Sequence, residues 1–144
     1  MTSYLLDTNA ISEAPKKSPD IGFMEWFINT NEANLFTSCL VLGEIKKGIN
    51  LNNDAARRAT FSKWLDEVID EFADRIVEVN NTVASLWGEL MASGQLAGKT
   101  PPIIDALLAA QCLTHKLTLV TRNVRDFEQF TGLQVFCPWS AKVG

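Results

Sequence analysis

The sequence predicts an α/β fold, a three-layer α/β/α sandwich with a largely parallel central sheet. Short apolar segments typical of buried strands alternate along the chain with longer segments of helical periodicity. Of the 144 residues, 47% are hydrophobic and 21% are charged, which is ordinary for a folded protein and argues against disorder. A chain of this length is expected to form one domain, spanning residues 1–144.

The first predicted strand is the short apolar segment of residues 3–6, which leads directly into Asp7. A short helix should follow it. Thr8 or Asn9 can cap this helix, and Pro15 should end it because proline donates no backbone hydrogen bond.

A second helix is expected to begin at Ser18 and Pro19, as N-cap and first helical residue. The apolar positions on one face of this helix are Ile21, Met24, Phe27 and Ile28. Residues 35–38 form the second predicted strand. A helix over residues 41–49 should come next, and it carries Glu44.

The clearest helix is predicted over residues 54–73, because its apolar residues recur at steps of three and one. Those apolar residues are Phe61, Trp64, Leu65, Val68, Ile69 and Phe72. A third strand is predicted over residues 76–79. Asn81 or Thr82 is expected to cap the next helix, which should reach about Leu96.

A loop rich in glycine and proline separates this helix from the last third of the chain. Its marker residues are Gly94, Gly98, Thr100, Pro101 and Pro102. A mostly apolar helix over residues 103–113 and a strand over residues 117–120 should follow. A short helix over residues 124–130 and a last strand over residues 134–136 complete the prediction.

Cysteine and histidine chemistry is disfavoured by the sequence. Cys39, Cys112 and Cys137 lie far apart, without CxxC spacing, and are expected to act as small buried hydrophobic residues. The single histidine, His115, is expected at a helix end with no plausible serine or cysteine nucleophile beside it. A histidine-based zinc site and a Ser-His-Asp triad are therefore excluded as readings of the sequence.

Three acidic side chains lie at the edges of apolar elements. Asp7 follows the first predicted strand, whereas Glu44 and Asp105 interrupt the apolar residues of two predicted helices. Each alone fits an ordinary role: a turn residue, a solvated helix residue, and an N-terminal helix acid favoured by the helix dipole. Carboxylates in apolar surroundings are rarely buried unless they are paired or metal-bound. Together, the three acids therefore indicate a shared cation at the carboxyl ends of the strands.

A divalent cation would remove the cost of gathering these carboxylates, because without a counter-ion at least one of them would stay protonated. Oxygen ligands suit Mg²⁺ or Mn²⁺ better than zinc or copper. Such an ion lowers the pKa of a bound water and neutralises charge on a phosphoryl oxygen. The pattern therefore favours metal-assisted attack on a phosphoester.

Four sequence blocks, in this order, resemble the PIN-domain ribonucleases, in particular the VapC and FitB-like toxins of bacterial toxin–antitoxin pairs. The blocks span nearly the whole chain. They are LLDTN at residues 5–9, the segment from Ser38 through LGEIKKG at residues 42–48, PPIIDALLA at residues 101–109, and LVTRNVRDF at residues 119–127.

The resemblance implies a PIN-like sandwich in which Asp7, Glu44 and Asp105 are the core acids. Asp7 and Asp105 would bind the metal directly, and Glu44 would bind it directly or orient its water. Thr8 would support the first carboxylate through its hydroxyl. The fourth acidic position of many family members falls here on Asn123, a departure that would weaken a second metal.

Asp126, one helical turn beyond Asn123, can substitute at the fourth position or be a solvated capping residue. Arg122 can contact a phosphate or pair with an acid. The tryptophans Trp26, Trp64, Trp87 and Trp139 are expected in the core rather than as base-stacking platforms.

The function implied by the resemblance is that of a Mg²⁺- or Mn²⁺-dependent endoribonuclease toxin. A metal-activated water would attack RNA in line and leave a 5′-phosphate and a 3′-hydroxyl. The substrate would be a structured RNA such as a tRNA or an rRNA loop. The implied partners are a cognate antitoxin and a second copy of the chain, or a heteromeric toxin–antitoxin assembly that binds operator DNA through the antitoxin.

Two other classes of protein compete with this interpretation. Haloacid-dehalogenase-like phosphatases also place an aspartate after the first strand. Their pattern has a second aspartate two residues later, where this chain has Asn9. A receiver-like or other non-catalytic α/β binding module would not need Glu44 in line with Asp7 and Asp105. Metal-dependent RNA cleavage, compared with phosphatase activity on a small phosphoester, discriminates these classes.

The net charge of −4 argues at first against a nucleic-acid partner. However, residues 66–78 hold six of the 17 acids and one of the 13 bases, so the remainder carries 11 acids and 12 bases. Basic residues beside the motifs are expected to contact phosphates; they are Lys46, Lys47, Arg122 and Arg125. The chain has no apolar segment long enough to span a membrane and no signal-peptide pattern at its start, so a cytoplasmic location is expected.

Overall fold

A five-stranded, all-parallel sheet forms the centre of the protein, as the computed structural model shows for residues 1–140. Residues 141–144, the end of the expected domain, lie outside the described residues. The strands are β1 (Tyr4–Leu6), β2 (Leu35–Ser38), β3 (Ile76–Val77), β4 (Thr118–Val120) and β5 (Val135–Phe136). Their spatial order is β3-β2-β1-β4-β5.

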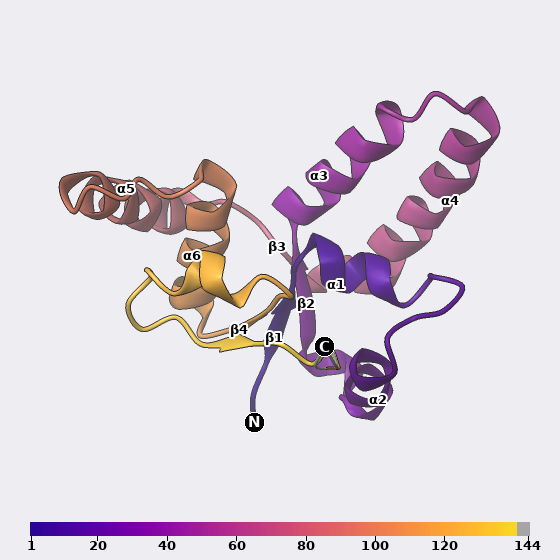
Figure 1. The fold of residues 1–144 in the computed structure, drawn as a ribbon, viewed down its shortest axis with the longest axis horizontal. Helices are drawn as coiled ribbons and strands as arrows, with labels where there is room; N and C mark the ends of the chain where they lie inside the picture. Colours follow the sequence, from indigo (N-terminus) through magenta and orange to yellow (C-terminus); the bar gives the residue numbers. More distant parts are fainter. Residues whose placement is uncertain (141–144) are drawn as a thin grey trace.

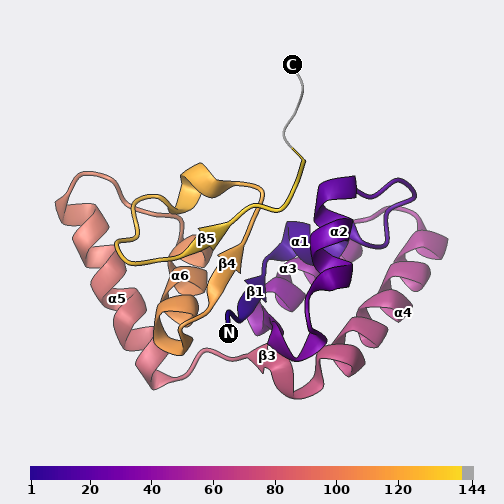
Figure 2. The same ribbon diagram turned by 90° about the horizontal axis from the view of Figure 1, so that it is seen from below.

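Helices cover both faces of this sheet and confirm the predicted sandwich. They are α1 (Thr8–Glu13), α2 (Ile21–Asn29), α3 (Cys39–Asn50), α4 (Ala55–Phe72), α5 (Asn81–Leu96) and α6 (Ile103–His115). Helices α5 and α6 lie on one side of the sheet and α1 to α4 on the other (Figures 1 and 2). Three short 3-10 turns are η1 (Glu32–Asn34), η2 (Ala73–Arg75) and η3 (Val124–Phe127). None of the helices within residues 1–140 is long and apolar enough to cross a membrane.

The central strand β1 marks the point where the sheet reverses its order. The chain moves outward through β2 and β3, and then returns to the other side of β1 with β4 and β5. In register, Leu6 lies beside Thr37 of β2 and Val120 of β4. Asp7 and Thr121 are the residues that follow β1 and β4, so both lie at the switch point where such sheets bind ligands.

The core is apolar, and the four tryptophans lie in it or pack against it, as the sequence predicts. Leu5, Leu119 and Val120 are fully buried in the sheet. Trp139 is buried, and its ring lies 4.9 Å from that of Phe23 on α2. The other three tryptophans are partly buried and pack against the same core.

The predicted N-cap residues of three helices are wrong by one or two positions. Asp7 caps α1 in place of Thr8 or Asn9, and Asp20 caps α2 in place of Ser18. Asn80 caps α5 instead of Asn81 or Thr82. Each of these side chains precedes the first helical residue and accepts a backbone N–H three residues on, so the cap is the last residue with extended geometry.

Several element bounds also differ from the prediction. Helix α3 begins at Cys39, capped by Ser38, and continues to Asn50. Helix α6 continues to His115, strand β3 is shorter than residues 76–79, and residues 128–130 lie outside the short turn η3. Lys116 takes a left-handed conformation with φ of 56°, and this ends α6.

Some predicted core positions are exposed. Ile21 and Ile28 of α2 are 74% and 72% exposed, and the buried residue of that helix is Phe23. On α4, Phe61 is 42% exposed at the edge of the predicted apolar face. Cys137 is also exposed, contrary to its predicted burial, because it follows the end of β5. The apolar face predicted for each of these helices is therefore wider than the surface that the helix buries.

Candidate metal-binding active site

Asp7 is fixed at the end of β1 by hydrogen bonds to the neighbouring strand β4 and to helix α1. Its backbone N–H donates to the Val120 carbonyl of β4 at 3.2 Å, and its Oδ1 accepts from the Ala10 N–H at 2.9 Å. Burial raises the pKa of this carboxyl. A hydrogen bond with Thr121 and backbone N–H groups lower the pKa without cancelling the effect of burial. Asp7 is thus a rigid carboxylate that is costly to ionise.

Glu44 lies near the middle of α3, a helix whose start is fixed by Ser38 accepting from the Leu40 N–H at 3.0 Å. Burial raises the pKa of Glu44, and the negative charges of Asp105 and Asp7 raise it further. Lys47, one turn along the helix, lowers it. Glu44 therefore belongs electrostatically to the same group as the other two acids.

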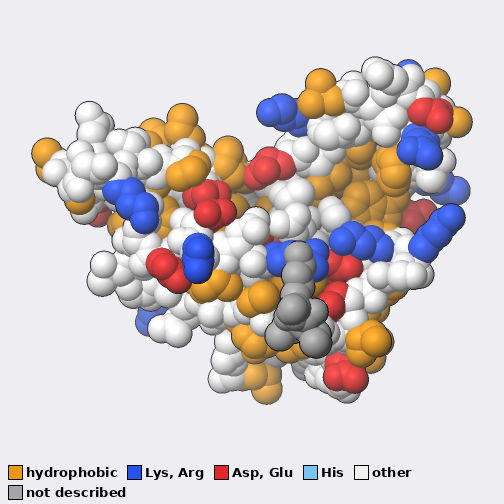
Figure 3. Space-filling model, viewed as in Figure 1, with side chains coloured by type: hydrophobic (Ala, Val, Ile, Leu, Met, Phe, Trp, Pro, Cys, Tyr) orange, Lys and Arg blue, Asp and Glu red, His pale blue; other side chains and the backbone are white. Residues whose placement is uncertain are grey.

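Asp105 lies in the first turn of α6, on the other helical layer. Burial raises its pKa, followed by the charges of Asp126 and Asp7. Three acids from separate parts of the chain thus converge at the carboxyl edge of the sheet. Figure 3 shows acidic side chains between the two helical layers on this face, with Lys and Arg side chains around them.

These acids fit a hard divalent cation with oxygen ligands, because a cation would offset the burial that raises all three pKa values and the repulsion that adds to it at Glu44 and Asp105. Residues 1–140 contain no group of three acidic, histidine or cysteine side chains gathered closely enough to enclose an ion. Ions such as Mg²⁺ commonly use one or two protein carboxylates and keep several waters. The arrangement is of this open kind.

Asp126 and Asn123, the two candidates for the fourth position, lie in different surroundings. Asp126 is on η3 and close enough to Asp105 to raise its pKa. The backbone N–H of Asn123 donates to the Thr121 hydroxyl at 3.1 Å, and its side chain is exposed and caps nothing. The structure therefore brings Asp126 to the acids and gives the Asn123 side chain no contact with them.

The four basic candidates differ in their distance from the acids. Arg125 lines a small pocket with Asp105 and Asp126, and Lys47 faces Glu44. Arg122 lies over the Trp139 ring, with its guanidinium carbon 5.8 Å from the ring centroid. Its positive charge also lowers the pKa of Asp20. Lys46 is exposed on α3.

Thr121 is a site residue to which the sequence reasoning assigned no role. Its hydroxyl reaches Asp7, which is the support that the sequence assigns to Thr8. Thr8 instead lines, with Glu44, a groove of about 580 Å³ between α1, α3 and α4. The signal for Thr121 was its place directly after β4, at the same level as Asp7 after β1.

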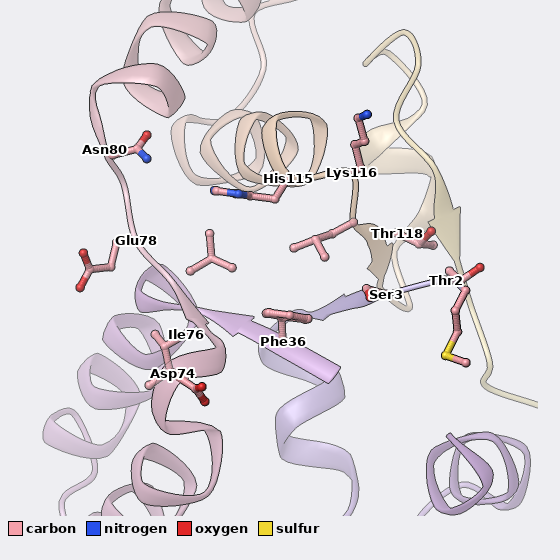
Figure 4. Close-up of a pocket in the computed structure, with 13 residues that line it drawn as sticks. Thr2, Ser3, Phe36, Asp74, Ile76, Glu78, Asn80, His115, Lys116 and Thr118 are labelled. Carbon is pink, nitrogen blue, oxygen red and sulfur yellow. The ribbon is translucent and has the colours of Figure 1, made fainter. Parts of the chain in front are cut away.

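A hollow larger than the groove beside Glu44 lies elsewhere, at the opposite edge of the sheet. It has a volume of about 760 Å³ and is lined near the starts of β1 and β4 (Figure 4). Ser3, Phe36, His115 and Thr118 are among its labelled residues, and none of the three core acids lines it. Its size therefore does not make it the catalytic site.

Comparison with known proteins identifies the family to which this fold belongs. The PIN domain family model matches residues 4–133, so the chain belongs to the PIN domain family. The chain is 31% identical over 138 residues to the plasmid stability protein StbB of Pseudomonas syringae pv. tomato, covering 95% of this chain and 99% of StbB. It is 29% identical over 136 residues to the VapC ribonuclease Y4jK of Sinorhizobium fredii, covering 94% of this chain and 96% of Y4jK.

A third relative has a solved structure. The chain is 26% identical over 136 residues to the toxin FitB of Neisseria gonorrhoeae, covering 94% of this chain and 97% of FitB. The crystal structure of FitAcB from the same organism superposes with a TM-score of 0.87 at 26% identity, over 96% of this chain and 99% of that one. The family resemblance read from the four sequence blocks is confirmed.

Proposed function

We propose that this protein is a divalent-metal-dependent endoribonuclease that acts as the toxin of a toxin–antitoxin pair. The observation that best supports this proposal is that Glu44 and Asp105, in a PIN-domain fold, both lie near enough to Asp7 for its charge to raise their pKa values. The names of its relatives, a VapC ribonuclease and a toxin, support the same class. The single domain over residues 1–144 would carry the activity.

Asp7 and Asp105 would hold a Mg²⁺ or Mn²⁺ ion from the two sides of the sheet. When bound, the ion supplies the charge that lets the carboxylates ionise together and lowers the pKa of the attacking water. Glu44, whose pKa is raised by burial and by the charges of Asp105 and Asp7, would bind the ion directly or orient its water. Asp126 would complete the acidic set beside Asp105, with Asn123 as the other candidate. Thr8, beside Glu44 in the groove, would contribute a hydroxyl.

The direct test compares RNA cleavage by the wild type, Asp7→Asn and Asp105→Asn in Mg²⁺, in Mn²⁺ and in EDTA. Both substitutions keep the size of the side chain and remove a negative charge. Cleavage and growth arrest should be lost in both variants and in EDTA, and the products should carry 5′-phosphates and 3′-hydroxyls. Asp66→Asn, on the exposed side of α4, is the matched control. Full activity in both site variants would refute the proposal.

The two rival classes are less well supported by the residues. Asn9 stands where a phosphatase of the haloacid-dehalogenase type would need its second aspartate, and it is exposed on α1. A non-catalytic module gives no reason for the charge of Asp7 to lie near both Glu44 and Asp105, where it adds to burial in raising their pKa values. Hydrolysis of a small phosphoester without RNA cleavage would favour the phosphatase.

The cognate antitoxin is proposed to bind in the apolar groove beside Glu44. Ile45, Phe61 and Trp64 supply its apolar wall, and Figure 3 shows hydrophobic side chains lining the hollow between α3 and α4. Phe61 is 42% exposed, and a bound apolar segment would cover it. An Arg or Lys on that segment could reach the acids and block them. Phe61→Glu should weaken antitoxin binding and leave RNA cleavage unchanged.

The remaining partners follow from the same class. The RNA substrate is proposed to be a tRNA or an rRNA, which places the activity in the cytoplasm. A homodimer is proposed, or a heteromeric assembly that binds operator DNA through the antitoxin. Leu96 and Ile103, on either side of the α5–α6 loop, are 89% and 58% exposed and offer apolar surface for a second copy. A small DNA-binding protein encoded beside this gene would support the pairing.

A further inference from the structure

A small polar pocket of about 200 Å³ opens on the α5–α6 side of the acids. The residues that form it are Lys99, Thr100 and Pro102 of the α5–α6 loop, Asp105 of α6, Arg125 and Asp126 of η3, and Gln129. It shares none of its lining with the apolar groove on the other side of the site, which contains Glu44. The core acids thus have an apolar groove on the Glu44 side and, on the Asp105 side, a polar pocket that holds two basic and two acidic side chains.

The loop that carries Lys99 is held in one conformation. The Lys99 N–H donates to the Gly94 carbonyl at 2.8 Å, and the Gln129 side-chain amide donates to the Lys99 carbonyl at 3.4 Å. Gly94 must lack a side chain, because a Cβ there would lie 2.6 Å from Cδ of Pro101. Gly98 turns the chain with φ of 78°. The Lys99 backbone is therefore positioned beside η3.

The chemistry of the pocket suits a phosphate group. Lys99 and Arg125 bring two positive charges, and Thr100 brings a hydroxyl donor. The charges of Asp105 and Asp126 oppose an anion only while no cation offsets them. Its volume exceeds that of one phosphate, leaving room for part of a ribose.

We propose that this pocket binds an RNA phosphate adjacent to the scissile one, through Lys99, Arg125 and the Thr100 hydroxyl. The proposal rests on the proposed function, because it names how that site holds its substrate. Gln129 and Gly94 are positioning residues that hold Lys99 in place. The RNA backbone then runs toward α5 and α6, away from the apolar groove.

The first experiment compares Lys99→Ala with Lys63→Ala, which removes the same charge from an exposed position on α4. Lys99→Ala should raise KM about tenfold with little change in kcat, as loss of one charge-assisted contact does. The slope of log K against log salt should become shallower by about 0.7 for single-stranded RNA. Lys63→Ala should match the wild type. If the two variants behave alike, the subsite is wrong.

The second experiment identifies the phosphate itself. RNA substrates carry a single neutral methylphosphonate at successive positions around the mapped cut. At one flanking position the substitution should weaken binding to the wild type about tenfold and add almost nothing in Lys99→Ala. Additive losses at every position would overturn the assignment.

Two further variants separate charge from position. Lys99→Arg keeps a cation and should recover most of the affinity. Gly94→Ala keeps the cation but displaces the loop, so its KM should rise as in Lys99→Ala while its circular dichroism stays native. An unchanged KM in Gly94→Ala would show that the loop contact does not position Lys99.

The failure of this proposal is distinguishable from failure of the proposed function. RNA binding is also measured by fluorescence anisotropy with Ca²⁺ in place of Mg²⁺, a readout that needs no cleavage. If the wild type cleaves RNA and Lys99→Ala equals Lys63→Ala, only the subsite is refuted. If the wild type binds RNA through Lys99 but does not cleave it, only the ribonuclease function is refuted. If the wild type neither binds nor cleaves RNA, both are refuted.

Discussion

Replacing Glu13 by alanine should destabilise the protein strongly, although Glu13 takes no part in the proposed chemistry. Glu13 ends α1 and is only 3% exposed. Its carboxylate accepts from the Trp139 indole N–H at 2.6 Å, the Lys16 ammonium at 3.2 Å and the Asp20 N–H at 3.2 Å. The chain after β5 is thereby tied to the loop between α1 and α2.

The magnitude follows from these contacts. Without Glu13 the buried indole N–H of Trp139 loses its acceptor, which costs about 1–3 kcal/mol. The Asp20 N–H bond adds about 1 kcal/mol, and the Lys16 pair adds little because that lysine side chain is 50% exposed. A total near 3 kcal/mol lowers Tm by roughly 10 °C for a chain of this size. Urea unfolding and calorimetry measure both quantities.

The effect should depend on pH in a definite direction. Burial alone would raise the pKa of Glu13, but the hydrogen bonds from Trp139, Asp20 and Lys16 together lower it below the ordinary 4.5. The contribution of Glu13 is therefore complete above pH 4.5 and lost as the pH falls through the lower folded-state pKa. The stability difference between wild type and Glu13→Ala should shrink in that acidic range.

Two matched variants test the reasoning. Glu13→Gln keeps an oxygen acceptor for the indole and should cost much less than Glu13→Ala. Trp139→Phe keeps the ring against Phe23 but removes the donor, so its loss should overlap with that of Glu13→Ala by about 1 kcal/mol in a double-mutant cycle. A Glu13→Ala variant within about 0.5 kcal/mol of the wild type at pH 7 would refute the argument.

Three further predictions concern the metal, the RNA and the second copy. Because the raised pKa values of the core acids make their ionisation costly in the fold, metal-free stability should fall as pH rises above their ordinary values of 3.8 and 4.5. Stabilisation by 10 mM Mg²⁺, measured by thermal shift, should therefore grow as the pH rises above these values, reaching about 1.4 kcal/mol for a Kd of about 1 mM. A stabilisation that does not change with pH would contradict this. Replacing four basic residues together by alanine should weaken RNA binding and flatten its salt dependence; they are Lys46, Lys47, Arg122 and Arg125. Unchanged binding would mean that these residues do not contact RNA, as the net charge of −4 at first suggests. Leu96→Glu should shift the light-scattering mass toward the monomer, and an unaltered mass would place any self-association elsewhere.

The sequence predicted the order and type of the main elements because their patterns are local. Each strand is a short apolar segment, and parallel strands bring their carboxyl ends to one edge. Asp7 could therefore be placed after β1 at the carboxyl edge, and the structure shows that the end of β4 lies beside it. The approach of Glu44 and Asp105 to Asp7 follows from the same topology, since α3 begins directly after β2 and α6 leads back to the start of β4.

Contacts between distant residues without a shared pattern were not predictable. The bond from Trp139 to Glu13 joins residues 126 positions apart, and neither lies in a motif. The place of Lys99 depends on Gly94 and Pro101 meeting across a loop, which composition marks only as a turn. Caps were misplaced by a residue or two because several adjacent Asx, Ser or Thr residues compete, and backbone geometry decides among them.

The negative charge at position 7 has no explanation in stability. Asp7 caps α1 through one oxygen, and an asparagine could accept the same Ala10 N–H. The charge itself is costly, because burial raises the pKa of Asp7 and its charge also raises the pKa values of Glu44 and Asp105. Asp7→Asn should therefore raise the metal-free stability by about 1 kcal/mol while abolishing the metal-induced shift. A charge that costs stability in the metal-free fold is accounted for by the divalent cation that we propose at the carboxyl edge of this sheet.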